Sequence, residues 1–181
     1  MNSALYFVLP LLLMSQTPHH DPLYKRLQRL YFYAAQNVAY LKPFEDTLQL
    51  LVKRYGPYPT IQMYRYGALA LKARYTTNLL QKKDYLYTSM ASMDAQVART
   101  PNDPEVRFIR GSFYYYLPFF LGKRKAAQDD ILTLSTLLET QAPQLTLLYD
   151  KEVLRAMTEF IAQTGWVEEE RIKKLQQLYA L

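Results

Sequence analysis

Apolar side chains recur at steps of three and four along most of this chain, which is the spacing that places them on one face of an α-helix. The first such stripe consists of Leu23, Leu27, Leu30, Tyr31, Ala34, Val38 and Leu41. Asp21 and Pro22 supply a helix cap and a first-turn proline, and Pro43 is expected to end this helix and to open the next one. No segment shows the sustained alternation of apolar and polar residues that is typical of a strand. The pattern therefore predicts an all-α protein.

Glycine and proline residues divide the rest of the chain into further helices. The clearest breaks are Gly56–Pro59 and Thr100–Pro104, and single glycines or prolines mark the others. The expected helices cover residues 44–55, 60–75, 82–99, 104–116, 125–140 and 143–164, and a last helix follows Gly165. Residues 21–181 are thus expected to form a single helical-repeat domain of about eight helices, including helices that cap its ends.

Two of the expected helix pairs are similar to each other in sequence. The pairs cover residues 59–100 and 101–140, and Gly67 of the first aligns with Gly111 of the second at an offset of 44. The second helices of the two pairs align at an offset of 41. A glycine at the same point of both first helices predicts that the second helix of each pair approaches closely there, because no side chain intervenes.

The second pair resembles the tetratricopeptide repeat, whose pattern is W-x2-L-G-x2-Y, then A-x3-F, then a closing Pro. The positions that match this pattern, some of them only approximately in residue type, are Gly111, Tyr114, Ala127, Ile131 and Pro101. The chain departs from the pattern at Arg107, where Trp is usual, and at Arg110, where Leu is usual. The resemblance implies a short right-handed stack of helical hairpins, an α-solenoid whose inner groove binds other proteins or peptides.

The first residues of the chain predict export. Residues 4–14 form an uncharged apolar run of eleven residues, which is shorter than the about 20 residues of a membrane-spanning helix and suits the core of a secretory signal peptide. We therefore expect residues 1–15 to be a signal peptide, residues 16–20 to be a linker, and the protein to be periplasmic or envelope-associated in a bacterium. A buried N-terminal helix is the competing interpretation. The absence of Cys excludes disulfides and a lipidated N-terminal cysteine.

Positive charge is concentrated in the first half of the chain. Residues 1–100 carry 12 Lys/Arg and 5 Asp/Glu, a net of +7, whereas residues 101–181 carry 10 and 11, a net of −1. A basic half that is rich in tyrosine can face nucleic acid, anionic lipid or an acidic protein, or it can simply be solvated. Export makes nucleic acid an unexpected partner, which leaves a protein or peptide partner, with peripheral membrane contact as the second interpretation.

The chain contains no recognisable catalytic motif, so the sequence predicts no enzyme, no cofactor, no metal site and no small-molecule substrate. His19 and His20 are interpreted as part of a solvated linker. Asp129 and Asp130 are interpreted as a solvent-facing pair, because successive residues of a helix point in different directions. A small envelope enzyme that uses carboxylates is the alternative.

The segment Arg107–Leu121 is unusually aromatic, and its three successive tyrosines cannot all point inward from one helix. Arg107, Arg110 and Tyr114 share one helix face by their spacing, and the forked donors of arginine suit carboxylates and peptide backbone. The predicted partner-binding residues are Arg65, Tyr66, Arg107, Arg110, Tyr114 and Tyr115. In the alternative, the rings fill the space between hairpins and the arginines reach out to water.

Together these observations predict a non-enzymatic interaction or scaffold module, exported to the cell envelope, which holds a protein or peptide in a groove lined by Arg and Tyr. The alternative from another class is a membrane-attached accessory subunit that keeps residues 1–15 and turns its basic first half toward anionic lipid.

Overall fold

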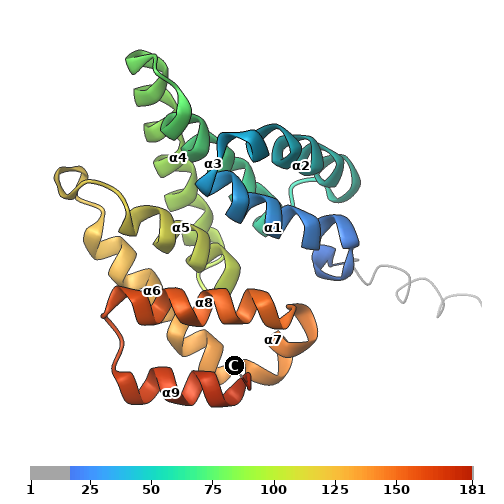
Figure 1. Cartoon of the computed structure of the whole chain (residues 1–181), viewed down its shortest axis with the longest axis vertical. Coiled ribbons are helices and arrows are strands. Elements are labelled where there is room, and N and C mark those ends of the chain that lie inside the picture. The colour runs from blue at the N-terminus through green and yellow to red at the C-terminus, as the bar shows by residue number, and fades with distance from the viewer. Residues whose placement is uncertain (1–16, 181) are drawn as a thin grey trace, which may run out of the picture.

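The computed structural model describes residues 17–180, and this part of the chain consists of α-helices and short 3-10 turns without any strand (Figure 1). The all-α prediction is therefore confirmed. The helices that lie within a few residues of their predicted bounds are α3 Pro59–Tyr75, α4 Leu79–Arg99, α5 Pro104–Tyr115 and α6 Arg124–Thr140. Their starts have local causes. For example, the Asn78 side chain accepts hydrogen bonds from the backbone N–H groups of Leu80 and Gln81 at the start of α4.

The first predicted helix is in fact two elements. Helix α1 ends at Gln36, and after the 3-10 turn η3 (Val38–Tyr40) helix α2 begins. The break is at Asn37, whose backbone is extended and whose side chain accepts a hydrogen bond from the N–H of Ala39 at 2.9 Å. An asparagine that bonds to the backbone in this way competes with helix formation. The bounds of the two helices are α1 Pro22–Gln36 and α2 Leu41–Tyr55.

Pro43 does not end a helix, because it lies in the first turn of α2, where a missing N–H costs no intrahelical hydrogen bond. The buried apolar stripe that was expected to continue through Val38 is interrupted there, since the Val38 side chain is 53% exposed.

Residues 141–180 form three helices rather than the two that were predicted. The residue that interrupts the expected helix 143–164 is Tyr149, whose backbone is extended. Gly165 adopts the left-handed conformation (φ 68°) and ends the following helix, as expected. The bounds are α7 Ala142–Leu148, α8 Lys151–Thr164 and α9 Glu169–Leu178.

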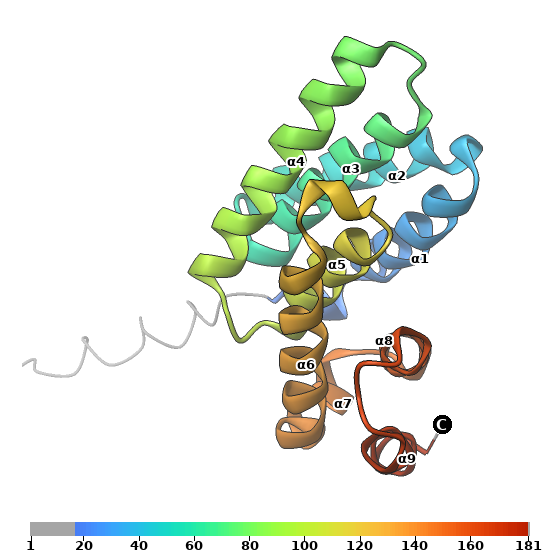
Figure 2. The same cartoon turned by 90° about the vertical axis from the view of Figure 1, so that its left-hand side faces the viewer.

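The helices associate largely as neighbouring pairs. Helix α3 packs mainly on α4, and α5 packs mainly on α6, which confirms the predicted pairing. Figure 1 shows α1–α4 in the upper part, α8 and α9 in the lower part, and α5 and α6 between them; in Figure 2, α6 runs from the upper part toward α7. One buried apolar cluster is formed by residues of α1–α5 and a second by residues of α6–α9, in keeping with this division.

The two aligned glycines have different surroundings. A Cβ atom on Gly111 would lie 3.0 Å from the Cβ of Asp130 on α6, so the predicted close approach of the second helix is confirmed there. A Cβ atom on Gly67 would instead lie 2.8 Å from the ring of Tyr31 on α1, not against α4. The prediction that both glycines mark the same crossing point is therefore wrong, because α1 occupies the space beside Gly67.

Candidate functional site

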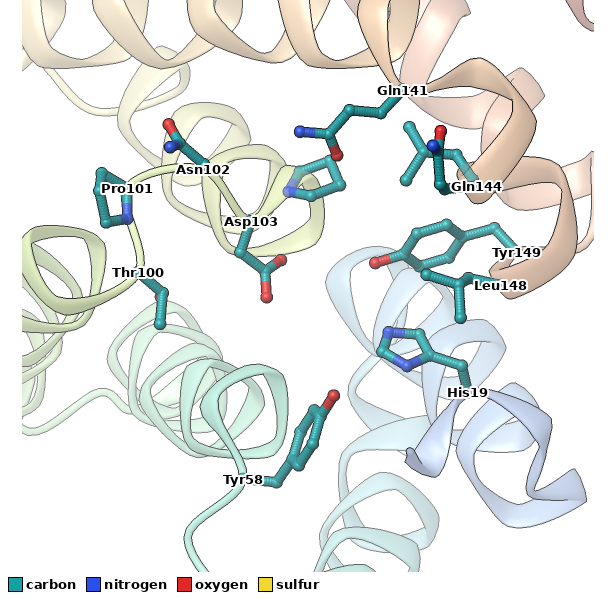
Figure 3. Close-up of a pocket in the computed structure, with 12 residues that line it drawn as sticks. His19, Tyr58, Thr100, Pro101, Asn102, Asp103, Gln141, Gln144, Leu148 and Tyr149 are labelled. Atoms are coloured by element: carbon teal, nitrogen blue, oxygen red, sulfur yellow. The ribbon is translucent and has the colours of Figure 1, made fainter. Parts of the chain in front are cut away.

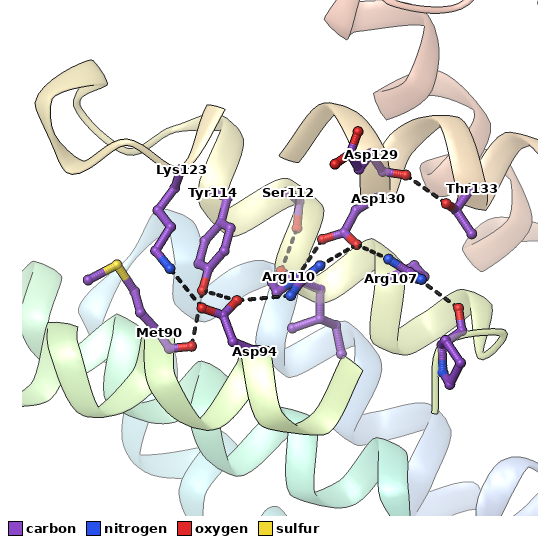
Figure 4. Close-up of polar contacts among 12 residues, drawn as sticks. Met90, Asp94, Arg107, Arg110, Ser112, Tyr114, Lys123, Asp129, Asp130 and Thr133 are labelled. Atoms are coloured by element: carbon purple, nitrogen blue, oxygen red, sulfur yellow. Dashed lines mark hydrogen bonds and ion pairs between the residues drawn. The ribbon is translucent and has the colours of Figure 1, made fainter. Parts of the chain in front are cut away.

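The arginine and tyrosine predicted to line a groove on α5 lie inside the molecule instead (Figure 4). Arg110 is only 9% exposed and Tyr114 only 1% exposed. The guanidinium of Arg110 donates two hydrogen bonds to the carboxylate of Asp130, from Nε at 2.7 Å and from Nη2 at 2.8 Å. This bidentate geometry is the strong form of an arginine–carboxylate contact. Arg110 was expected to bind a carboxylate of a partner. The carboxylate that it binds instead belongs to Asp130 of the same chain.

Asp130 is the centre of this contact and is fully buried. It also accepts a hydrogen bond from Nη1 of Arg107 at 2.7 Å. The prediction that Asp129 and Asp130 both face solvent is correct for Asp129 and wrong for Asp130. The close approach of α6 at Gly111 leaves no room for water beside Asp130, and a buried carboxylate must then be paired. Asp129 and Asp130 therefore do not form a pair of free carboxylates, since Asp130 is held in this contact.

Asp94 extends the contact to α4. It accepts hydrogen bonds from Nη1 of Arg110 at 2.9 Å, from the Tyr114 hydroxyl at 2.8 Å and from Nζ of Lys123 at 2.7 Å. Partial burial would raise the pKa of Asp94, but Lys123 and Tyr114 outweigh it and hold this pKa below its usual value. We call Asp94, Arg107, Arg110 and Asp130 the ion-pair network. It ties α4, α5 and α6 together, so its role is structural.

The other three predicted residues lie outside the network, two of them on α3 and one on α5. Arg65 is exposed on α3 and donates to the side chain of Gln62 at 2.9 Å, and Tyr66 is partly exposed nearby. Tyr115 packs edge-on against Phe160 of α8, with ring centroids 5.5 Å apart. The six predicted residues therefore do not line one groove, because α5 turns its Arg and Tyr face toward α4 and α6.

A different set of residues surrounds a pocket of about 400 Å³, shown in Figure 3. It lies where four parts of the chain meet: the 3-10 turn η2 (Pro18–His20), the start of α3, the loop between α4 and α5, and α7 with the residue after it. We call it the His19 pocket. Its titratable and amide-bearing lining residues are His19, Tyr58, Asn102, Asp103, Gln141, Gln144 and Tyr149. No Lys or Arg lines it.

His19 is the most unusual member of this pocket. It is only 6% exposed, and its ring lies 5.1 Å from the rings of both Tyr24 and Tyr149. Neither of its ring nitrogens has a hydrogen-bond partner among residues 17–180. The prediction of a solvated linker is wrong at this residue, because η2 folds back against α1 and carries His19 inside. Buried polar atoms are almost always paired, so the two unpaired nitrogens indicate a place for a polar ligand.

Glu105 lies next to His19, behind the residues that line the pocket, and is 1% exposed. Its carboxylate accepts a hydrogen bond from Gln28 at 2.9 Å, lies 2.6 Å from the Tyr24 hydroxyl, and also accepts from the Tyr64 hydroxyl. Nε2 of His19 lies 3.6 Å from Oε2, which is too far for a hydrogen bond. The sequence analysis did not single out Glu105, since an acidic residue in the first turn of a helix is common on protein surfaces.

The charge on Glu105 is stabilised by its neighbours. Burial would raise the pKa of Glu105, but His19, Gln28 and Tyr24 outweigh burial and hold it below its usual value. Burial and the nearby charge of Glu105 raise the pKa of both Tyr24 and Tyr64 well above the usual value. The two hydroxyls therefore stay protonated and act as donors to an ionised carboxylate.

Asp103 stands at the wall of the pocket and also begins α5, where its carboxylate accepts hydrogen bonds from the backbone N–H groups of Glu105 and Val106, both at 3.0 Å. Burial raises the pKa of Asp103 to about 6, with the charge of Glu105 adding to it and the bond from Val106 opposing it. At neutral pH both carboxylates are ionised, and the pocket is negative. In residues 17–180 no group of three or more His, Asp and Glu is arranged to hold a metal ion.

The chain matches no protein-family model, no curated protein and no solved structure. The similarity to the tetratricopeptide repeat therefore stays a prediction, and the function has to be argued from the site alone.

Proposed function

We propose that this protein is a non-enzymatic interaction module that binds a protein partner by taking one of its Lys or Arg side chains into the His19 pocket. The observation that carries the proposal is a buried histidine, whose two ring nitrogens have no hydrogen-bond partner among residues 17–180, in a pocket with acidic and aromatic walls and no Lys or Arg in its lining. The partner-binding role was expected from the sequence, but the proposed site differs from the expected one.

The chemistry of the walls favours a cation. Figure 3 shows the Asp103 carboxylate, the His19 ring and the hydroxyls of Tyr58 and Tyr149 directed toward the same space. A negative carboxylate attracts a positive head group, and the tyrosine hydroxyl oxygens can accept hydrogen bonds from it. Gln141 lies at the rim and adds an amide oxygen that can accept a hydrogen bond. A volume of about 400 Å³ suits a single long side chain better than a folded segment.

The stacking of helical hairpins is part of the proposal. The pairs α3 with α4 and α5 with α6 support it, and they would form the two clearest units of a tetratricopeptide-like stack. In such a stack the partner is held on a surface shared by several hairpins. The His19 pocket fits this arrangement because it is built from η2, segments of both repeated hairpins and α7.

Binding of a basic side chain can be tested with short peptides. An alanine peptide that contains one Arg is expected to shift the NMR signals of the His19 ring, whereas the same peptide with citrulline, the neutral isostere of Arg, is not. The Asp103→Asn variant is expected to bind the Arg peptide about tenfold more weakly, since a nearby charge contributes on the order of 1–2 kcal/mol. Asn caps a helix as well as Asp, so α5 stays intact.

The pH dependence of this binding has a defined sign. A cation binds the ionised form of Asp103, whose pKa is raised to about 6, so affinity is expected to fall as the pH drops below about 6. Asp129→Asn, which removes an exposed charge on α6, is the matched control and should leave binding unchanged. Equal shifts with the Arg and citrulline peptides, or equal binding by Asp103→Asn, would rule out this site.

We also propose that the protein is exported to the cell envelope, on the strength of the apolar run at residues 4–14. The expected signal peptide 1–15 lies outside the described residues, and within residues 17–180 no helix is long and apolar enough to span a membrane. Intact-mass measurement of the protein from its native host is expected to show the loss of about fifteen N-terminal residues. A mass that includes residues 1–15 would favour the membrane-attached alternative.

A further inference from the structure

Two connections between helices carry large apolar side chains into solvent. The loop between α5 and α6 exposes Phe119 by 87% and Phe120 by 73%. The start of α4, at the turn after α3, exposes Leu79 by 77% and Leu80 by 82%. Exposure of this degree on adjacent apolar residues is unusual for a protein surface that faces only water. We call these two places the aromatic tip (Tyr116–Gly122) and the leucine tip (Thr76–Lys83).

The aromatic tip is held in shape by its backbone. Helix α5 ends at Tyr115, and after Pro118 the chain forms the 3-10 turn η4 (Phe119–Leu121). Gly122 closes the turn in the left-handed conformation, with φ 67°, which favours glycine. The rings of Phe119 and Phe120 contact each other, with centroids 6.0 Å apart, rather than the buried clusters. The two rings are thus presented outward by an ordered turn.

Positive charge lies close to the exposed apolar residues of both tips. Lys123, Arg124 and Lys125 follow the aromatic tip, and no Asp or Glu occurs between Val106 and Gln128. Arg124 and Lys125 are exposed, as is Lys83 in the leucine tip. Cations at the N-terminus of α6 oppose the helix dipole, which favours negative charge at that end. The helix dipole therefore does not explain these cations, although Lys123 also pairs with Asp94 and the guanidinium of Arg124 lies over the ring of Trp166.

The two tips lie on the same side of the molecule. In Figure 1 both connections project toward the upper left, and the loop after α5 is the outermost part of that side. Figure 2, which looks onto that side, shows both connections in the upper half of the molecule, with the one between α3 and α4 above the one between α5 and α6. A flat surface can therefore touch both tips at once.

We infer that the aromatic tip and the leucine tip together dock this protein on an anionic lipid surface. Phe119, Phe120, Leu79 and Leu80 enter the interfacial layer, and the adjacent lysines and arginines meet the lipid phosphates. The combination of exposed apolar residues with basic neighbours, repeated at two separate places that share one plane, suits a negatively charged membrane interface. This surface is separate from the His19 pocket, so the inference stands or fails independently of the proposed function.

Vesicle sedimentation tests the inference with the full chain. Vesicles of phosphatidylcholine with about one third phosphatidylglycerol are expected to bind the protein, and binding should weaken in high salt or without the anionic lipid. The variants Phe119→Ser/Phe120→Ser and Leu79→Ser/Leu80→Ser are each expected to bind about tenfold more weakly, because each loses two membrane-inserted side chains. All four positions are exposed, so the variants should keep their helical circular dichroism spectrum.

The matched control removes equally apolar side chains elsewhere. Leu50 on α2 is 54% exposed and Leu147 on α7 is 74% exposed, and both helices lie at the other side of the molecule in Figure 1. The Leu50→Ser/Leu147→Ser variant is expected to bind the vesicles like the wild type. An equal loss in this control, or unchanged binding by both tip variants, would overturn the inference.

Insertion of the aromatic tip into the membrane can be measured directly by fluorescence, and residues 1–15 do not affect this measurement. In a Phe119→Trp variant, the new indole is expected to show a blue-shifted emission on anionic vesicles that exceeds any change from the native Trp166. Vesicle-bound protein without that shift would overturn the inference. So would a Phe119→Ser/Phe120→Ser variant that loses self-association or capture of a protein while keeping its vesicle binding, since the tip would then serve another partner.

Discussion

Replacing Asp130 with Ala is expected to lower the free energy of unfolding by about 3–5 kcal/mol, the usual cost of removing one partner from a buried ion pair. Asp130 is fully buried and accepts three hydrogen bonds from Arg107 and Arg110. Without it, the guanidinium of Arg110 stays buried with only Asp94 as an acidic partner. The loss would remove a large share of the stability of a domain of this size. Urea unfolding followed by circular dichroism at neutral pH measures it.

The neighbouring residue supplies the control. Asp129 is exposed on the same helix, so Asp129→Ala is expected to change the free energy of unfolding by no more than about 0.5 kcal/mol. The double variant Arg110→Met/Asp130→Leu should be more stable than Asp130→Ala, because it removes both buried charges and fills their space. If Asp130→Ala and Asp129→Ala are equally stable, the ion-pair network does not hold α5 and α6 together.

Replacing Glu105 with Leu is expected to cost about 3–5 kcal/mol, since the buried hydroxyls of Tyr24 and Tyr64 and the amide of Gln28 lose their acceptor. Glu105→Gln should cost less, about 1–2 kcal/mol. The amide keeps one acceptor oxygen, and the hydroxyl of Tyr24 can turn its proton to Thr60, whose Oγ1 lies 2.6 Å away. Chemical unfolding of both variants measures the difference. Equal losses would mean that the shape of Glu105, rather than its hydrogen bonds, supports the fold.

A comparison of Glu105→Gln with the wild type also gives a pH test. The pKa of Glu105 is lowered from the usual 4.5 in the folded state, so below that value the unfolded chain binds more protons. Its contribution to stability is complete above pH 4.5 and is lost as the pH falls. We expect Glu105→Gln to lose stability less steeply than the wild type on acidification. Asp21 and Asp94, whose pKa values are also lowered, contribute equally in both proteins, and Asp103 acts in the opposite direction in both.

The helices of this protein were largely predictable from short stretches of sequence. The starts of α4 and α5 follow from Asn78 and Asp103, which cap them within three residues, and the end of α8 follows from Gly165. The pairing of α3 with α4 and of α5 with α6 was also predictable, because short loops bring consecutive helices together. The breaks at Asn37 and Tyr149 were missed, since neither residue carries a signal as strong as Gly or Pro.

The direction in which polar side chains point could not be predicted from short stretches of sequence. Periodicity places Arg110 and Tyr114 on one face of α5, but whether that face meets water or α6 depends on how the hairpins pack. The contacts that bury Glu105 come from Tyr24 and Gln28, which are 81 and 77 positions away in the chain. His19 is buried by the ring of the nearby Tyr24 and by the rings of Tyr58 and Tyr149, which come from distant segments. Helix formation depends on neighbouring residues and can be recognised in the sequence, whereas burial of a charge depends on which distant surfaces meet and emerges when the chain is folded.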